Sequence, residues 1–266
     1  MPKKLSKITS QKLIASASLA GTLLLTPAGD SLQALPEKSP LQRLPLGLLS
    51  QDELKKLLKE LIAKKLPSSS RVLTVDEEKS LSKILLDTYG VKASTELEGN
   101  RLNNQIGQIG LEQHLQRFPG DTLADRTFPQ AGMAPGRGAW GYFVPSKNQI
   151  TLAAVQKEKY YIAVQTLYLP DWKKRVGELY QWYKYRKVLV INPDTGNVVV
   201  AVIGDAGPAK WTGKQFGGSP QVMADLGLYP KKTKGKVIIL FVDDPQDQVP
   251  LGPLTHSLDK PAPSLI

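Results

Sequence analysis

The sequence contains no cysteine and only two histidines, His114 and His256. Without cysteine the chain has no disulfides, no thiol nucleophile and no cysteine-based zinc site. Two histidines are too few for a multi-histidine metal centre, and neither a GxxxxGK phosphate loop nor a serine–histidine–acid signature is present. We therefore expect neither metal nor cofactor, and any hydrolytic metal would need carboxylate ligands.

Acidic residues are also in the minority, with 24 Asp and Glu against 35 Lys and Arg, and the formal net charge is +11. A hydrophobic fraction of 41% over 266 residues is enough to bury a globular core. A basic protein is attracted to polyanions. Outside a cell these are anionic wall polymers and lipid headgroups, and peripheral contact with such a surface is expected in preference to nucleic acid.

The N-terminus has the pattern of a secretory signal peptide. Four lysines within residues 3–12 precede an uncharged run of Leu and Ala at residues 13–25, which is too short to span a bilayer. Small residues at Ala28 and Ala34 suit cleavage, and the alternative is a retained anchoring helix. We expect export to the cell envelope or beyond, and without residues 1–34, which hold four lysines and one aspartate, the net charge falls to +8.

Two helices are expected before residue 90. Ser50 with Glu53 forms a capping box at the start of a basic amphipathic helix over residues 50–66, which could lie on a membrane or partner or pack on its own domain. Thr74 with Glu77 starts the second helix, and Gly90 can end it. Residues 92–138 are rich in Gly and Pro and predict an irregular segment that wraps a scaffold. His114 in this segment is a candidate catalytic residue or ligand, with a hydrogen-bonded structural role as the alternative.

A hairpin is predicted at residues 188–191 and 198–203, two β-branched runs joined by a turn that contains Pro193 and Gly196. The second strand leads into Asp205 within the sequence GDAGP, so one carboxylate is placed at a strand end in a glycine-framed loop. A short helix over residues 219–226 follows, with Ser219 as its N-cap, and then a last strand over residues 236–242.

This order resembles the double-psi β-barrel domain of rare lipoprotein A, the expansins and membrane-bound lytic transglycosylase A. The residues that carry the resemblance are the strand pair at 188–200, the Asp205–Pro208 motif, the Gly217-Gly218-Ser219 segment and Leu226-Gly227. Residues 160–170 resemble the family's early strand, and residues 138–144, with Trp140, resemble its first strand. The resemblance covers about residues 137–242. It implies a mainly β fold, a six-stranded double-psi barrel with a short helix, preceded by an α-helical N-terminal region.

The resemblance also implies binding of cell-wall glycan, with peptidoglycan as the expected polymer. Members that cleave glycan use an acid in a D-L-S motif, but this position falls in the Gly217–Gly218 pair, so Asp205 is the single candidate acid/base of a lytic transglycosylase. In the lytic route the sugar's own 6-hydroxyl attacks and one residue serves as acid and base. The alternative is a non-catalytic, expansin-like or partner-binding barrel. The candidate glycan-binding residues are Trp140, Lys210, Trp211, Lys214, Gln215 and Ser219.

Two further segments carry open alternatives. Residues 171–187 mix aromatic and basic side chains, which fits a helix that covers the barrel, a carbohydrate-stacking surface or a single-stranded nucleic acid site, in that order of preference. Asp243, Asp244 and Asp247 could offer oxygens to calcium, but their spacing is not that of an EF-hand and a polar turn is favoured. The expected segments are a signal peptide at 1–34, a linker and amphipathic helix at 35–70, a helix and wrapping segment at 71–136, the barrel at 137–254 and a tail at 255–266.

Overall fold

The computed structural model of the chain describes residues 50–63 and 69–255. The predicted signal peptide, most of the proline-rich linker and all but the first residue of the predicted tail lie outside the described residues. Among the described residues, no helix has the length and apolar character that a membrane crossing requires.

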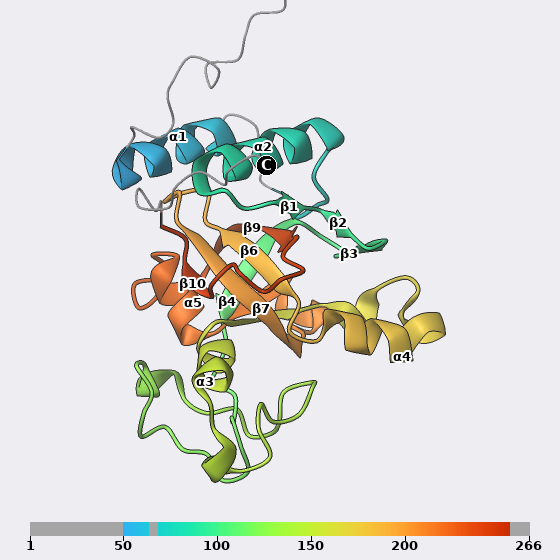
Figure 1. Cartoon of the computed structure of the whole chain (residues 1–266), viewed down its shortest axis with the longest axis vertical. Coiled ribbons are helices and arrows are strands. Elements are labelled where there is room, and N and C mark those ends of the chain that lie inside the picture. The colour runs from blue at the N-terminus through green and yellow to red at the C-terminus, as the bar shows by residue number, and fades with distance from the viewer. Residues whose placement is uncertain (1–49, 64–68, 256–266) are drawn as a thin grey trace, which may run out of the picture. The chain divides into compact units, whose positions relative to one another are not determined.

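Six strands of the described residues close into a mixed β-barrel (Figure 1). They are β4 (Ile106–Leu111), β5 (Tyr161–Val164), β6 (Lys187–Ile191), β7 (Val198–Ala206), β8 (Phe216–Gly218) and β9 (Lys234–Val242). Around the barrel the order is β9, β4, β8, β5, β7, β6 and back to β9. The β4–β8 and β5–β7 pairs are parallel, and the other four pairs are antiparallel.

The strand pairing has an internal two-fold symmetry. If β4, β5 and β6 are exchanged with β7, β8 and β9, the antiparallel β4–β9 pair becomes the antiparallel β7–β6 pair. The parallel β4–β8 pair becomes the parallel β7–β5 pair. The two remaining pairs, β5–β8 and β6–β9, map onto themselves. The barrel is therefore built from two three-strand units of identical connectivity.

The predicted hairpin is confirmed as β6 and β7, paired from Lys187↔Val202 to Ile191↔Val198. Its β-branched side chains are buried on both faces because one face lines the barrel and the other lies under covering segments. Gly196 takes the left-handed backbone conformation in the turn, with a φ of 74°. A side chain there would also overlap with the backbone of Lys55, so the turn requires glycine on both grounds.

Side chains alternate between the barrel interior and its outer face. Ile162, Val164 and Ile203 belong to the interior core, whereas Tyr161 and Val202 pack on the outside with Leu115. This period of two is the direct consequence of strand geometry. It determines which polar side chains at the strand ends can share a face.

The first barrel strand is not where the sequence predicted it. Residues 138–144 form only an isolated bridge between Gly138 and Gly141, and β4 supplies the strand from within the segment expected to be irregular. Gly107 and Gly110 had indicated turns. In the structure both residues lie inside β4. Glycine is needed at these two positions because the side chains of Gln215 and Lys214 occupy the space where a Cβ atom would be.

Helices α1 (Gln51–Ala63) and α2 (Val75–Tyr89) begin at the predicted capping residues. Glu53 accepts a hydrogen bond from the backbone of Ser50, and Thr74 and Glu77 complete both halves of a capping box. Gly90 ends α2 in the left-handed conformation. Leu58 of α1 is fully buried, which supports packing of this helix on its own domain. The predicted last residues of α1 lie outside the described residues.

Three more helices surround the barrel: α3 (Leu152–Lys159), α4 (Trp172–Tyr183) and α5 (Pro220–Asp225). In α4, Trp182 contacts Phe241 edge to face at 5.2 Å and the Tyr183 hydroxyl donates to the Arg101 carbonyl. The aromatic helix therefore packs on the barrel, as preferred from the sequence. Helix α5 has the predicted N-cap, since the Ser219 hydroxyl accepts from the Val222 amide.

Short elements complete the described chain. The edge strands β1 (Ala93–Ser94) and β10 (Gly252–Pro253) pair with β9 and β7, and β2 (Glu96–Leu97) and β3 (Asn100–Arg101) form a separate hairpin. The 3₁₀ turns are η3 (Pro129–Ala131), η4 (Lys147–Gln149), η5 (Thr166–Tyr168) and η6 (Lys210–Thr212).

Candidate functional site

Three residues paired across the neighbouring strands β7, β5 and β8 form a row on the outer face of the barrel. Ala163 of β5 pairs with Asp205 of β7 on one side and with Gly217 of β8 on the other. Residues paired directly across strands project to the same face of a sheet. Because the neighbours of Ala163 along β5, Ile162 and Val164, point into the core, this row lies on the outside.

An irregularity in β7 puts Asp205 on this face. The register shifts after the Ile162↔Ile203 pair, and the next pair is Ala163↔Asp205, so Gly204 is the extra residue of a β-bulge. A Cβ on Gly204 would lie 2.6 Å from the Cβ of Tyr161, so only glycine fits there. Without the bulge, residue 204 would occupy the Ala163 position and Asp205 would turn toward the interior.

The carboxyl group of Asp205 is held by backbone amides. Its Oδ1 accepts hydrogen bonds from Ala139 at 2.7 Å and from Ala206 at 2.9 Å, and Oδ2 accepts none from the described residues. Partial burial raises the pKa of Asp205, and the two amide hydrogen bonds act in the opposite direction with a smaller effect. A carboxyl with one fixed oxygen, one free oxygen and a raised pKa is suited to donate a proton.

The other end of the row is occupied by a carboxylate that the sequence did not point out. The side chain of Glu112 runs over Gly217, and a Cβ on Gly217 would lie 2.7 Å from the Cδ of Glu112. Glu112 extends β4 beside β8, since its amide donates to the Gly218 carbonyl at 2.8 Å. Glu112 thus fills the space beside the Gly217–Gly218 pair.

Lys214 accompanies Glu112 on this face. Its Nζ lies 3.0 Å from Oε1 of Glu112, and its aliphatic chain crosses Gly110. The side chains of Glu112 and Lys214 keep 30% and 16% of their surface exposed. The two glycines of neighbouring strands, Gly110 and Gly217, therefore make room for one partly exposed ion pair.

Tyr161 is influenced electrostatically by both carboxylates. Its pKa is raised well above the ordinary value, first by burial and then by the negative charges of Glu112 and Asp205, with Glu158 contributing as well. The phenol hydroxyl donates to the carbonyl of Gln113, the residue after Glu112. Both carboxylates are thus within electrostatic reach of one buried side chain.

The loop between β7 and β8 presents Trp211, of which 88% is exposed. Beside it, the Nζ of Lys210 lies 4.8 Å from the ring centroid of Tyr168, and Tyr168 and Leu167 are exposed as well. Large aromatic rings are ordinarily buried, so the exposed indole of Trp211 makes this loop a candidate binding surface.

The remaining predicted glycan-binding residues have internal contacts. The side-chain oxygen of Gln215 accepts from Ser70 and from the Gln108 amide, both at 2.8 Å. Ser219 is fully buried as the N-cap of α5 and donates to the Lys159 carbonyl. Trp140 is only 5% exposed and donates through its indole nitrogen to the Tyr180 carbonyl at 2.7 Å, so its ring is packed in the core and does not present an exposed face to a sugar.

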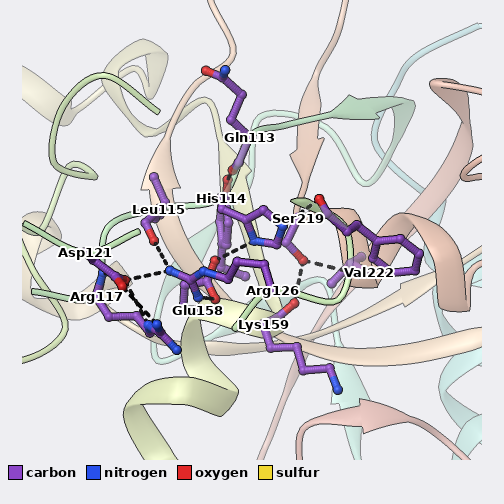
Figure 2. A network of polar contacts seen from close by, with 12 residues as sticks. Gln113, His114, Leu115, Arg117, Asp121, Arg126, Glu158, Lys159, Ser219 and Val222 are labelled. Atoms are coloured by element: carbon purple, nitrogen blue, oxygen red, sulfur yellow. Dashed lines mark hydrogen bonds and ion pairs between the residues drawn. The ribbon is translucent and has the colours of Figure 1, made fainter. Parts of the chain in front are cut away.

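His114 belongs to a buried ionic network rather than to the outer row (Figure 2). Its Nδ1 lies 3.0 Å from the Glu158 carboxylate and its Nε2 lies 3.1 Å from the Phe128 carbonyl. A carbonyl oxygen can only accept, so Nε2 carries a hydrogen. With both ring nitrogens engaged inside the protein, His114 has the hydrogen-bonded structural role.

Two arginines complete this network. Arg126 contacts both Glu158 and Asp121, and Arg117 makes a two-point contact with Asp121. Burial acts to raise the pKa of Asp121, but hydrogen bonds from Arg117 and the charge of Arg126 hold it below its usual value. Arg117 and Asp121 lie close to His114 in the sequence, but Glu158 lies 44 residues from His114 and has no local sequence signal that connects it to the network.

The aspartates after the last strand contact a cation of the chain itself. Lys187 Nζ lies 2.7 Å from Asp244 and 2.5 Å from Asp247, which agrees with a polar turn. No group of three or more potential metal ligands occurs among residues 50–63 and 69–255.

No protein-family model matches this chain, and no curated protein matches its sequence.

Proposed function

We propose that this chain is an exported barrel protein of the double-psi type that binds cell-wall glycan and breaks its glycosidic bonds, with Asp205 as the proton donor. The support for the double-psi type is the pairing symmetry of the barrel. Two identical three-strand units joined by two parallel pairs, β4–β8 and β5–β7, have the connectivity that this type of barrel requires.

The single observation that carries the catalytic proposal is the environment of Asp205. Protonation of a leaving oxygen requires a carboxyl group that keeps its proton near neutral pH and can reach the substrate. Partial burial raises the pKa of Asp205, and Oδ2 receives no hydrogen bond from the described residues. If Asp205 acts alone, the route is the lytic one, in which the 6-hydroxyl of the sugar attacks and an anhydro-sugar end forms.

The binding proposal rests on the loop that joins β7 to β8. Trp211 presents an exposed indole face of the kind that stacks on the apolar C–H face of a sugar ring. Lys210 lies in the same loop, and its charge suits the lactyl and peptide carboxylates of peptidoglycan, whereas Lys214 of this loop is paired with Glu112. The loop connects the strand of Asp205 to the strand of Gly217, so bound glycan would lie close to both.

Purified peptidoglycan sacculi test this function. We expect the full-length protein to release soluble muropeptides, and we expect Asp205→Asn to reduce the rate by about 10²–10⁴-fold, the usual contribution of a general acid. The matched control is Asp194→Asn, because Asp194 is exposed in the turn of the β6–β7 hairpin. Equal release by wild type and Asp205→Asn would refute the role of Asp205.

A second function is favoured by the exposure of Trp211 alone, namely a non-catalytic barrel that binds wall polysaccharide or a partner. In that case the protein sediments with sacculi, Trp211→Ala weakens sedimentation by about tenfold, which corresponds to about 1.4 kcal/mol, and no muropeptides are released by any variant. The two functions are separated by product analysis in the same incubation.

A further inference from the structure

Asp205 has a candidate partner on the same face of the barrel. Ala163 pairs with both Asp205 and Gly217, so the side chain of Asp205 and the Cβ direction of Gly217 project to the same side. The carboxyl group of Glu112 lies where that Cβ would be. Two carboxylates, one from β7 and one from the residue after β4, therefore lie on the outer side of this row, and the side chain of Glu112 keeps 30% of its surface exposed.

The strand spacing sets their separation. Neighbouring strands lie about 4.8 Å apart, so Asp205 and Gly217, two strands from each other, have Cα atoms about 10 Å apart. Glycoside hydrolases that act with one attacking water hold their two carboxyl groups about 6.5–9.5 Å apart, and those with a covalent intermediate hold them closer. The estimated spacing of the row is therefore close to the separation that leaves room for a water molecule.

The carboxyl groups of Asp205 and Glu112 have different surroundings, as the proton donor and the proton acceptor of a two-carboxylate site do. Asp205 is half-buried and has no cation among its hydrogen-bond partners. Glu112 has the Lys214 ammonium 3.0 Å from its Oε1. A proton donor and a proton acceptor with contrasting environments form the usual arrangement of a two-carboxylate site.

We propose that Glu112 is the second catalytic residue of this site, acting as general base for the hydrolysis of a β-linked wall glycan. This inference rests on the proposed function and extends it to the reaction class. Glu112 takes a proton from water, the water oxygen bonds to the anomeric carbon, and the bond from that carbon to the bridging oxygen breaks. Asp205 gives its proton to the departing oxygen. Exchange with solvent then returns the proton to Asp205 and removes it from Glu112.

Peptidoglycan sacculi digested in ¹⁸O-labelled water test the proposal. We expect one ¹⁸O in each new reducing end and a loss of about 10²–10⁴-fold in rate for Glu112→Gln. The control Glu60→Gln, on the exposed surface of α1, should leave the rate unchanged. A second variant, Glu112→Ala, should regain rate with added formate, which can replace a missing carboxylate but cannot repair a misfolded chain.

The outcomes separate this inference from the proposed function. Anhydro ends without ¹⁸O, made equally fast by Glu112→Gln, would overturn the role of Glu112 and leave Asp205 as the single acid. Absence of cleavage by the wild-type protein would overturn both. A slow Glu112→Gln variant with an unchanged melting temperature, together with formate rescue of Glu112→Ala, would support the two-carboxylate site.

Discussion

Nδ1 of His114 lies 3.0 Å from Oε1 of Glu158, and this contact joins the segment after β4 to helix α3. Arg126 and Asp121 extend the connection within the same segment. The segment continues to Ala139, whose amide donates to Asp205. The buried network therefore stabilises the part of the chain that fixes one oxygen of the candidate acid.

Removal of the negative charge of Glu158 from this network should lower the stability of the protein. In Glu158→Gln the buried Arg126 loses half of its carboxylate contacts, and breaking a buried ion pair from one side costs about 3–5 kcal/mol. We expect the free energy of unfolding, measured by urea denaturation, to decrease by about 3–5 kcal/mol. Glu178→Gln is the control, since Glu178 also pairs with an arginine but is 60% exposed and should change stability by less than about 1 kcal/mol. Equal effects of the two variants would contradict the structural role of the network.

Local sequence patterns were sufficient for elements whose signals lie within one segment. The capping residues Ser50 and Thr74 gave the helix starts, and the β-branched runs around the 192–197 turn gave the hairpin. Ser219 and Pro220 gave the start of α5. In each case the residues that determine the structure are neighbours in the chain, so propensity and pattern contain the information.

The candidate site could be predicted only in part, because its remaining members meet through strand pairing. Asp205 was evident from its glycine-framed motif, but Glu112 lies over Gly217, more than a hundred residues further along the chain. Gly107 and Gly110 concealed β4, since glycine indicates a turn unless the side chain that fills its space is known. The exposure of Trp211 and the burial of Trp140 likewise depend on tertiary neighbours such as Tyr180.

Gly217 should not tolerate a side chain. A Cβ there would overlap with the Glu112 carboxyl, so Gly217→Ala must displace Glu112 from Lys214 or strain β8. We expect a loss of about 1–3 kcal/mol in the free energy of unfolding, as for other overpacked positions. Gly177→Ala is the control, because Gly177 in α4 has open space around its Cβ position and alanine favours a helix. Thermal unfolding of both variants checks this, and an equally stable Gly217→Ala protein would contradict the placement of Glu112.

The stability of the chain should fall in acid partly through Glu77. Hydrogen bonds from Arg71 lower the pKa of Glu77 to about 2, whereas the pKa of a glutamate in the unfolded chain is about 4.3. The carboxylate therefore stabilises the fold above the unfolded value, and that contribution is lost as the pH falls toward 2. Glu77→Gln should cost about 1–2 kcal/mol at pH 7 and almost nothing at pH 2. Urea denaturation at both pH values tests this, and a cost independent of pH would exclude the ionic contribution.

The contribution of Asp205 to stability should depend on pH in the opposite sense to that of Glu77. Burial raises its pKa, so the folded state favours the protonated form, and stability is lost as the pH rises through the folded pKa. Asp205→Asn keeps a carbonyl oxygen for the Ala139 and Ala206 amides but has no charge. We expect the variant to have a higher melting temperature than wild type at pH 7 and no advantage at pH 3. A variant less stable than wild type at pH 7 would show that the carboxylate is favoured by the fold.

Trp211 should affect binding without affecting stability. Its side chain is 88% exposed, so Trp211→Ala removes little buried surface and should change the free energy of unfolding by less than about 0.5 kcal/mol. If the indole stacks on glycan, its loss should weaken sedimentation with sacculi by about tenfold, which corresponds to about 1.4 kcal/mol. Leu152→Ala is the matched control, because Leu152 is 83% exposed on α3 and lies outside the β7–β8 loop. Equal sedimentation of wild type and Trp211→Ala would remove the loop from the glycan-binding surface, whereas a specific loss in Trp211→Ala would locate the polymer beside the strands that carry Asp205 and Gly217.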